Sequence, residues 1–357
     1  VAVMDNAQLD ASGQNGGGSV LVGGDAHGAN PDVQNANITY FGANAGIKAD
    51  ALDNGNGGKV IVWADDTTRA SGNISARGGA NSGDGGFVET SGHRYLDAKG
   101  AHVNASASHG SAGQWLLDPT DINIVYGGAI STYGGTLTSG VFTPGAGAAT
   151  IADSDINSTF STGTSVTINT SSGYGGQGNI TVYGSADIGG SAHVINTYGG
   201  ALSLTLIADH NIDMHAGSAI TGSVGSPLNI SMNAGSPYGG GISLLGNPLQ
   251  TFGGSIDLSA TGGSVSGSAL LDTRSYSYYG AAPDAGNITV SGDSISLGAL
   301  NASGGDGSSG GNGGHGGSVS LTANGAITTG IIDTHGGNGA AAVSSTYGGS
   351  AGGGGSV

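Results

Sequence analysis

Cysteine is absent from the 357 residues, and only seven residues are lysine or arginine. Without cysteine no disulfide can form, which suits a chain that crosses an oxidising compartment unfolded and then passes through a narrow pore. Twenty-four acidic residues leave a formal net charge of −17, which argues against nucleic acid and anionic membrane surfaces as partners. No apolar run is long enough to cross a bilayer, so we expect no membrane insertion.

Glycine is abundant, with 76 residues, and it brackets short runs of alternating β-branched residues. Such runs predict strands, because side chains alternate between the two faces of a sheet. The clearest runs are residues 17–22 (GGSVLV), 57–62 (GGKVIV), 85–89 (GGFVE), 178–182 (GNITV), 286–290 (GNITV) and 316–321 (GGSVSL). Shorter second strands follow at residues 73–76, 211–214 and 326–329.

Strands of this length, separated by Gly, Asn and Ser and recurring at roughly 20 residues, predict an all-β fold, a parallel β-helix (β-solenoid) with loop insertions. A β-sandwich or barrel is the alternative, and it would require hairpin turns between the runs. One helical turn is expected at residues 153–160, capped by Asp153 or Ser154. The predicted core comprises Val20, Val22, Val60, Val62, Val88, Leu116, Ile180, Val182, Ile288, Val290, Val319 and Leu321.

A string of motifs organises residues 1–125, whereas residues 126–357 continue the strand pattern with Tyr-Gly-Gly loops and insertions. Val1 lies within a strand pattern, and residues 354–357 open a coil that does not close. We therefore expect this chain to be a fragment of a longer protein, open at both ends.

The motif string carries a family resemblance. Residues 57–64 (GGKVIVWA) are followed by Asp65-Asp66-Thr67-Thr68, then by residues 72–79 (GNISARGG), 85–92 (GGFVETSG) and 113–119 (GQWLLDP). This string resembles the exoproteins of two-partner secretion, particularly the filamentous haemagglutinin and high-molecular-weight adhesin branch. The match is close over residues 17–125 and looser over 151–182, and the chain lacks the amino-terminal secretion domain and a carboxy-terminal anchor or toxin.

The resemblance implies a secreted β-helical adhesin on the outer surface of a Gram-negative bacterium. Its expected partners are an outer-membrane transporter during secretion and, on host or bacterial surfaces, a glycan or protein. One alternative is a subunit that stacks end to end into an extracellular fibre, since terminal coils present unpaired edges.

A second alternative is a polysaccharide-acting enzyme, which requires carboxylates grouped on one face. The candidates are Asp65 with Asp66, and Asp118 with Asp121. Both pairs suit polar turns, and we expect Lys48, Lys59 and Arg69 to form ion pairs with Asp65 and Asp66. The chain is therefore predicted not to be an enzyme.

No metal or other cofactor is predicted. Residues 304–317 have the glycines of a calcium-binding β-roll but only Asp306 as a carboxylate, which favours a flexible or tightly turned loop. His102 with His109, and His210 with His215, could align on stacked coils, but neither pair has a cluster of further ligands.

Nine Asn-x-Ser/Thr triplets are possible glycosylation sites, although Asn followed by Ile-Thr also suits a corner that leads into a strand. They begin at Asn37, Asn73, Asn104, Asn157, Asn169, Asn179, Asn229, Asn287 and Asn301.

Tyrosines mark the predicted binding region. Tyr-Gly-Gly begins at Tyr126, Tyr133, Tyr174, Tyr198, Tyr238 and Tyr347, where each ring either covers the end of a coil or binds a partner. The insertion at residues 272–285 holds Tyr276, Tyr278, Tyr279 and Arg274, the only cation after Lys99. Tyr and Arg are enriched at binding hot spots, so we predict that this loop projects and contacts a glycan or protein.

Overall fold

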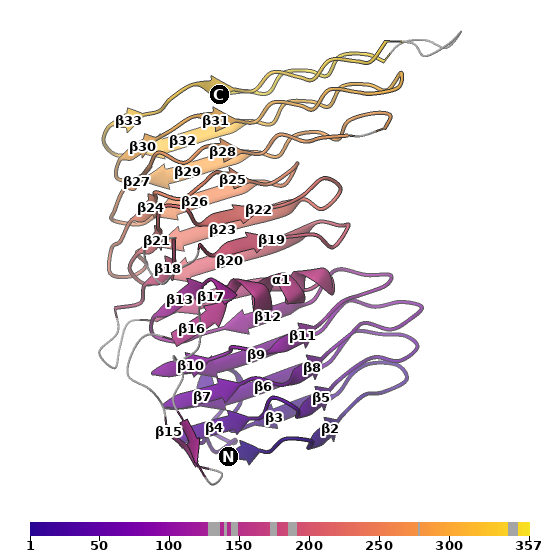
Figure 1. The fold of residues 1–357 in the computed structure, drawn as a ribbon, viewed down its shortest axis with the longest axis vertical. Coiled ribbons are helices and arrows are strands. Elements are labelled where there is room, and N and C mark those ends of the chain that lie inside the picture. The colour runs from indigo at the N-terminus through magenta and orange to yellow at the C-terminus, as the bar shows by residue number, and fades with distance from the viewer. Residues whose placement is uncertain are drawn as a thin grey trace. The chain divides into compact units, whose positions relative to one another are not determined.

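The structure, a computed structural model, describes residues 1–127, 149–171, 177–184, 191–277, 279–341 and 349–357, and the backbone of 136–138 and 141–143. Parallel strands wind into a β-solenoid of about nine turns, which confirms the predicted fold class (Figure 1). The chain divides into two compact units, Val1–Ala192 and His193–Val357. The tyrosine-rich region predicted from residue 126 onward therefore begins inside the first unit.

The first unit has three parallel sheets, and a regular turn gives one strand to each. The first sheet is β3 (Ser19–Val22), β6 (Lys59–Ala64), β9 (Phe87–Gly92), β12 (Gln114–Leu117) and β17 (Ser165–Thr170). The second, in spatial order, is β1 (Ala2–Val3), β4 (Ile38–Phe41), β7 (Thr67–Ala70), β10 (Tyr95–Asp97), β16 (Ala149–Ala152), β13 (Ile122–Val125) and β18 (Ile180–Val182). The third is β2 (Gln8–Asp10), β5 (Gly46–Lys48), β8 (Asn73–Ser75) and β11 (His102–Asn104).

The second unit repeats this plan. Its first sheet is β20 (Leu202–Ala208), β23 (Leu228–Ala234), β26 (Ile256–Ala260), β29 (Ile288–Gly292) and β32 (Val319–Ala323). Its second is β21 (Ile212–Met214), β24 (Ile242–Leu244), β27 (Val265–Gly267), β30 (Ile295–Leu297) and β33 (Ile327–Thr328). Its third is β19 (His193–Ile195), β22 (Ala219–Thr221), β25 (Leu249–Gln250), β28 (Leu271–Asp272), β31 (Leu300–Asn301) and β34 (Ile332–Asp333).

Aliphatic columns fill the interior because most strands alternate inward apolar with outward polar residues. In β23 the inward Ile230 pairs in register with Ile256 of β26, and both are buried. Ten of the twelve predicted core residues are buried, whereas Val20 and Leu321 are only half-buried. These two exceptions lie on β3 and β32, the outermost strands of their sheets, so each is covered by a neighbouring strand on one side only.

A turn of the solenoid is longer than the predicted length of roughly 20 residues. Val60 pairs with Val88, Ile230 pairs with Ile256, and Ile256 pairs with Ile288, so most turns take 26 to 32 residues. The additional residues form glycine-rich arms that leave each turn after the third sheet and return to the first (Figure 1).

Within each unit the arms stack into a layered structure that we call the glycine fin. The arms are residues 11–18, 49–58, 76–86 and 105–113 in the first unit, and residues 273–286, 302–317, 334–341 and 349–355 in the second. Within one arm the returning strand donates to the outgoing one, as in Gly58 N to Ala49 O at 2.7 Å. Between arms, Gly57 N donates to Asp84 O at 2.9 Å. A Cβ on Gly57 would lie 2.0 Å from the carbonyl oxygen of Ala76, so this layer spacing requires glycine.

The fin accounts for residues 304–317, whose backbone bonds to neighbouring arms on both sides. Gly304 N donates to His335 O at 2.8 Å, and Ala285 N donates to His315 O at 2.9 Å. The arm reverses between Ser308 and Gly311, where Gly311 N donates to Ser308 O at 2.9 Å. The prediction of a tightly turned loop is therefore confirmed, and the turn belongs to a packed layer.

One helix, α1 (Asp153–Ser161), replaces a third-sheet strand between β16 and β17 of the first unit. It is longer than the single predicted turn, and its N-cap is Ala152, without a side-chain cap, so the predicted caps were wrong. Thr162 Oγ1 donates to Val103 O at 3.2 Å, and Ala105 N donates to Thr164 Oγ1 at 2.7 Å, so the end of the helix satisfies the free edge of β11. Among the residues that the structure describes, no helix is long and apolar enough to cross a membrane.

A short antiparallel pair, β14 (Thr136–Thr138) and β15 (Val141–Thr143), is the exception to the parallel pairing among the described strands. It belongs to the segment between β13 and β16, so the solenoid is interrupted at this point by an insertion.

Candidate functional site

The outer face of the third sheet in the first unit is polar. On each strand the middle residue points inward, and Ile47, Ile74 and Val103 are buried. The flanking residues therefore form two outward columns, which run across the strands at one residue per turn, about 4.8 Å apart. The columns are Gln8, Gly46, Asn73 and His102, and Asp10, Lys48, Ser75 and Asn104.

Two hollows make this face a continuous groove, which we call the third-sheet groove. The first, of about 330 Å³, lies over the two columns, and Ser158 of α1 and its C-cap residue Thr162 close one end. The second, of about 230 Å³, lies toward the fin beside Leu52. Arg77 and Asn104 line both hollows, so they are parts of one surface.

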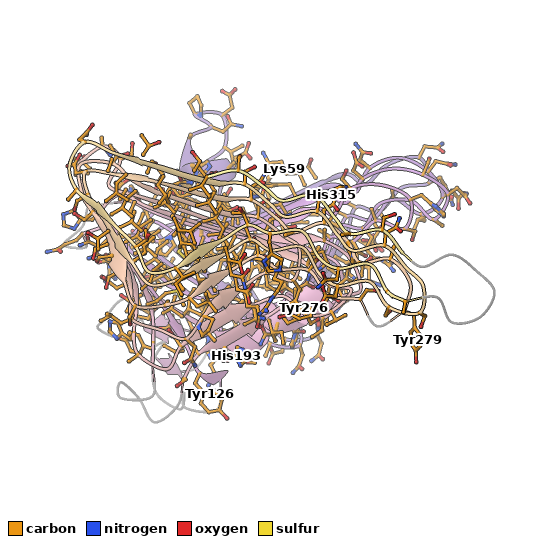
Figure 2. The ribbon with its side chains drawn as sticks, turned by 90° about the horizontal axis from the view of Figure 1, so that it is seen from above. Lys59, Tyr126, His193, Tyr276, Tyr279 and His315 are labelled. Carbon is orange, nitrogen blue, oxygen red and sulfur yellow. The ribbon has the colours of Figure 1, made fainter. Side chains whose placement is uncertain are left out.

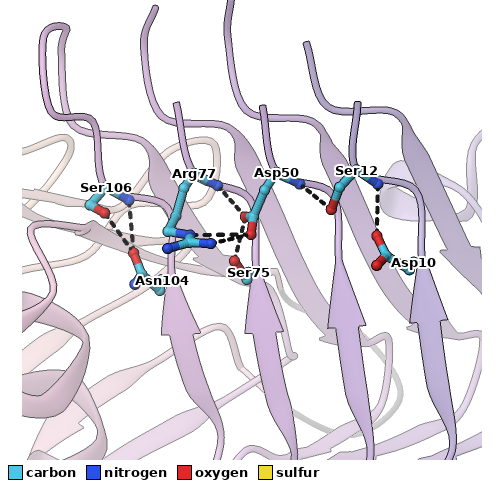
Figure 3. Close-up of polar contacts among 7 residues, drawn as sticks. All are labelled: Asp10, Ser12, Asp50, Ser75, Arg77, Asn104 and Ser106. Atoms are coloured by element: carbon cyan, nitrogen blue, oxygen red, sulfur yellow. Dashed lines mark hydrogen bonds and ion pairs between the residues drawn. The ribbon is translucent and has the colours of Figure 1, made fainter. Parts of the chain in front are cut away.

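Arg77 lies at the centre of the groove, where it is fixed by Asp50 (Figure 3). Its Nε and one terminal nitrogen donate to Asp50 Oδ2 at 3.1 and 2.7 Å, and its backbone N–H donates to Asp50 Oδ1 at 2.8 Å. Burial opposes ionisation of Asp50, but the hydrogen bonds from Arg77 and from Ser75 Oγ outweigh it and lower the pKa of Asp50. The Arg77 side chain is still 52% exposed, so the remaining guanidinium N–H groups face solvent.

Strand ends in the groove are held by short polar turns. Asp10 Oδ1 accepts from Ser12 N at 2.9 Å, and Asn104 Oδ1 accepts from Ser106 N at 3.1 Å (Figure 3). Such turns fix the carboxylate and the amide relative to the sheet. The groove therefore presents its polar groups on a rigid floor.

The chemistry of the groove suits a ligand with many hydroxyl groups. Amides, hydroxyls and the Lys48 and Arg77 cations offer both donors and acceptors along two parallel rows. Among the described residues, no group of three or more His, Cys, Asp or Glu side chains is placed to hold a metal ion. The groove is thus a candidate binding surface.

Sequence reasoning missed the groove, although a signal was present. Each of its strands is a polar or glycine residue, an aliphatic residue and a polar residue, as in Asn73-Ile74-Ser75 and His102-Val103-Asn104. Aligning these triplets requires the true length of a turn, which the fin arms make irregular.

The predicted binding loop, residues 272–285, is an arm of the fin in the second unit. Arg274 is not free, because its terminal nitrogen lies 3.0 Å from Oδ2 of the buried Asp272, and its guanidinium lies 5.0 Å from the centre of the Tyr276 ring. Phe252 packs against the same ring at 5.3 Å. Arg274 is therefore partly engaged within its own arm, since Asp272 lies two residues away.

The two described tyrosines of this arm lie differently (Figure 2). Tyr276 is half-buried beside a recess of about 300 Å³ that also contains Ser303, Asp306 and His335. Tyr279 is 86% exposed toward the tip of the arm, which fits the predicted projection. Tyr278 lies outside the described residues.

The Tyr-Gly-Gly triplets at Tyr198 and Tyr238 form turns. Gly199 and Gly239 adopt positive φ angles of 89° and 83°. The tyrosine rings are exposed to different extents: Tyr238 is 68% exposed, whereas Tyr126 and Tyr198 are close to 42%. A ring that covers the end of a coil would be buried, so that interpretation is wrong for Tyr238. The triplets at Tyr133, Tyr174 and Tyr347 lie outside the described residues.

The candidate catalytic carboxylates are occupied by local contacts. Asp65 Oδ1 accepts from Asn35 and Trp63, and Asp66 pairs with Arg94 at 2.5 Å. Asp118 bonds to His27, and Asp121 accepts from the backbone of Gln177 and Asn179.

The predicted ion pairs of the Asp65–Asp66 turn were wrong. Lys59 pairs with Asp25 at 2.5 Å, and Arg69 lies 3.6 Å from Asp97, because partners come from neighbouring turns of the solenoid. Asp65 and Asp66 do form a bend, but Thr67 and Thr68 begin β7 and are buried.

None of the nine predicted glycosylation asparagines is buried, and Asn37, Asn73 and Asn287 are exposed. Several act in turns: Oδ1 of Asn229 and of Asn287 accepts from backbone N–H groups of the next turn, Ser255 and Ser318. This agrees with the corner role that the sequence suggested.

No protein-family profile and no curated protein matches this chain. The relation to two-partner secretion exoproteins therefore stays a prediction from the motif string.

Proposed function

We propose that this chain is a segment of an extracellular adhesin that binds a polysaccharide along the third-sheet groove. The observation that carries the proposal is the pair of polar columns on a rigid parallel sheet, joined by Arg77 into one hollowed surface. An unbranched polysaccharide fits these columns, because it repeats its hydroxyl groups along a line as the columns repeat their side chains.

The resemblance in residues 17–125 supports the wider setting. In this proposal the chain is exported by an outer-membrane transporter and remains on the outer surface of a Gram-negative cell. The solenoid carries the groove away from that cell, and the groove attaches to glycans of host or neighbouring cells.

A triple variant tests the groove. Lys48→Ala, Asn73→Ala and His102→Ala remove exposed side chains from the groove floor and leave the buried middle column intact. The matched control is Asp257→Ala, Thr289→Ala and Ser320→Ala, an exposed column on the first sheet of the second unit.

Binding is measured on an array of unbranched neutral and acidic polysaccharides, with far-ultraviolet circular dichroism to confirm folding. We expect the groove variant to bind at least about tenfold more weakly, since several hydrogen bonds of about 1 kcal/mol each are lost. The control should bind like the parent chain. Equal binding by the groove variant and the parent, or no polysaccharide bound by the parent, would contradict the proposal.

A further inference from the structure

A loop covers part of the outer face of the first sheet in the first unit. Residues 23–36 form a compact loop whose ends meet, since Ala36 N donates to Gly23 O at 2.6 Å. Lys59 anchors it through Asp25, and Asn35 Nδ2 donates to Asp65 Oδ1 at 2.9 Å. Ile61 and Trp63 point outward from β6 and yet are buried, because this loop lies over them. The loop therefore encloses a patch that on a bare sheet would face water.

Two carboxylates lie in the enclosed patch, and both contact His27 of the loop. Glu89, the only glutamate of the chain, is fully buried, and its Oε1 accepts from His27 N at 3.2 Å. Asp118, with an 11% exposed side chain, lies 2.8 Å from His27 Nδ1 through Oδ2. The second oxygen of each, Glu89 Oε2 and Asp118 Oδ1, is buried without a hydrogen-bond partner.

A hydroxyl group completes the cluster. Ser91 lies two residues after Glu89 on β9, so both side chains point to the same face. The register pairs Ser91 with Trp63 and Thr90 with Leu117, which places Asp118 next to Ser91 on the neighbouring strand. Ser91 is fully buried, and its Oγ makes no hydrogen bond of good geometry, but it lies close enough to the Glu89 carboxylate to lower the pKa of that group, which burial raises.

Two buried carboxylate oxygens without partners, Glu89 Oε2 and Asp118 Oδ1, lie in one patch with the buried Ser91 hydroxyl, and they require an explanation because nearly all buried polar atoms are satisfied. Carboxylate and hydroxyl oxygens are ligands of hard divalent cations. We propose that Glu89, Ser91 and Asp118 bind a divalent cation of the calcium type beneath the loop of residues 23–36. Calcium affinity rises with the number of charged ligands, and this site has only two carboxylates. We therefore expect a Kd for calcium of about 10⁻⁴ to 10⁻³ M, as in extracellular calcium-binding modules.

Trp63 can report cation binding by energy transfer to a bound lanthanide, because it lies beside the proposed ligand Ser91 on the neighbouring strand. Terbium substitutes for calcium, and excitation of Trp63 should sensitise terbium emission that added calcium chloride suppresses. Trp63→Phe should weaken the emission, with Trp115 of β12 as the remaining donor, while still showing a calcium-dependent rise in Tm. This pair of results separates the sensor from the site.

Glu89→Gln keeps the shape of the side chain and removes its charge, and Asp118→Asn does the same on the neighbouring strand. Each should weaken calcium and terbium binding at least tenfold, and Ser91→Ala should weaken it less while perturbing the fold least. Asp257→Asn, an exposed acid of the second unit, is the matched control and should bind like the parent.

Terbium emission and a calcium-dependent Tm that are equal in Glu89→Gln and the parent would overturn the site. So would a parent chain that binds neither ion, combined with a Glu89→Gln variant of unchanged stability, since a proton on the buried carboxyl would then satisfy the cluster. The groove variants act on another sheet, so failure here is distinguishable from failure of the polysaccharide proposal.

Discussion

Adding a single methyl group to a glycine of the fin should change the free energy of unfolding in opposite directions at two positions. Gly317 lies between two arms, and a Cβ there would be 2.0 Å from the carbonyl oxygen of Gly286. Gly354 has room, since a Cβ there would be 3.5 Å from Thr334 O, and its φ angle is not in the left-handed region. Gly317→Ala and Gly354→Ala therefore form a matched pair.

The magnitudes follow from packing and chain entropy. Gly317→Ala must push two arms apart against backbone atoms, which costs about 1 to 3 kcal/mol, typical of overpacking. Gly354→Ala restricts the unfolded chain without strain in the folded state, which stabilises by about 0.4 to 1 kcal/mol. The two variants should thus shift the free energy of unfolding in opposite directions.

Urea unfolding followed by circular dichroism measures the difference, and hydrogen exchange of residues 302–317 shows whether the loss is local to the arm. In the parent chain Gly317 N donates to Ala302 O at 2.7 Å. The added methyl group should weaken this hydrogen bond, so the amide should exchange its hydrogen faster in Gly317→Ala. Similar midpoints for the two variants would refute the argument that the arms are in contact at this spacing.

Two further predictions concern the first unit. Val60→Asp buries an unpaired carboxylate between Val20 and Val88, so it should destabilise by several kcal/mol, whereas Asp at the half-exposed Leu21 should change the urea midpoint little. Arg77→Ala removes two donors from the buried Asp50 and should cost about 1 to 3 kcal/mol at neutral pH. Because the pKa of Asp50 is lowered from 3.8, the stability it contributes is present above pH 3.8 and is lost as the pH falls below it. That acid-dependent part should shrink in Arg77→Ala, and an unchanged pH profile of Tm would contradict the assignment.

The fold could be predicted because its strands are local patterns. Glycine-bounded alternation, as in residues 57–62, identifies strands without knowledge of their partners, and most of the predicted core is buried. The length of a turn could not be predicted in this way, because the glycine arms have no periodicity of side chains. What orders them is hydrogen bonding between main chains of successive turns.

Ion pairs and binding sites were harder to predict from the sequence than strands, because the residues that form them come from neighbouring turns of the solenoid. Asp66 pairs with Arg94, 28 residues along the chain, where sequence proximity suggested Arg69. Leu116 was predicted inward and is buried, but it is in register with Glu89 on the outer face, where the loop of residues 23–36 lies. A loop that folds back over a sheet cannot be inferred from alternation alone.

The glycine fin has a consequence for how the molecule acquires its structure. A glycine-rich arm has little apolar surface to drive its own collapse, and glycine loses more conformational freedom on ordering than any other residue. The hydrogen bonds between arms, such as Gly57 N to Asp84 O, therefore form only when the neighbouring arm is already in place. We therefore expect the fin to fold by propagation, in which each arm orders against a neighbouring arm that is already folded.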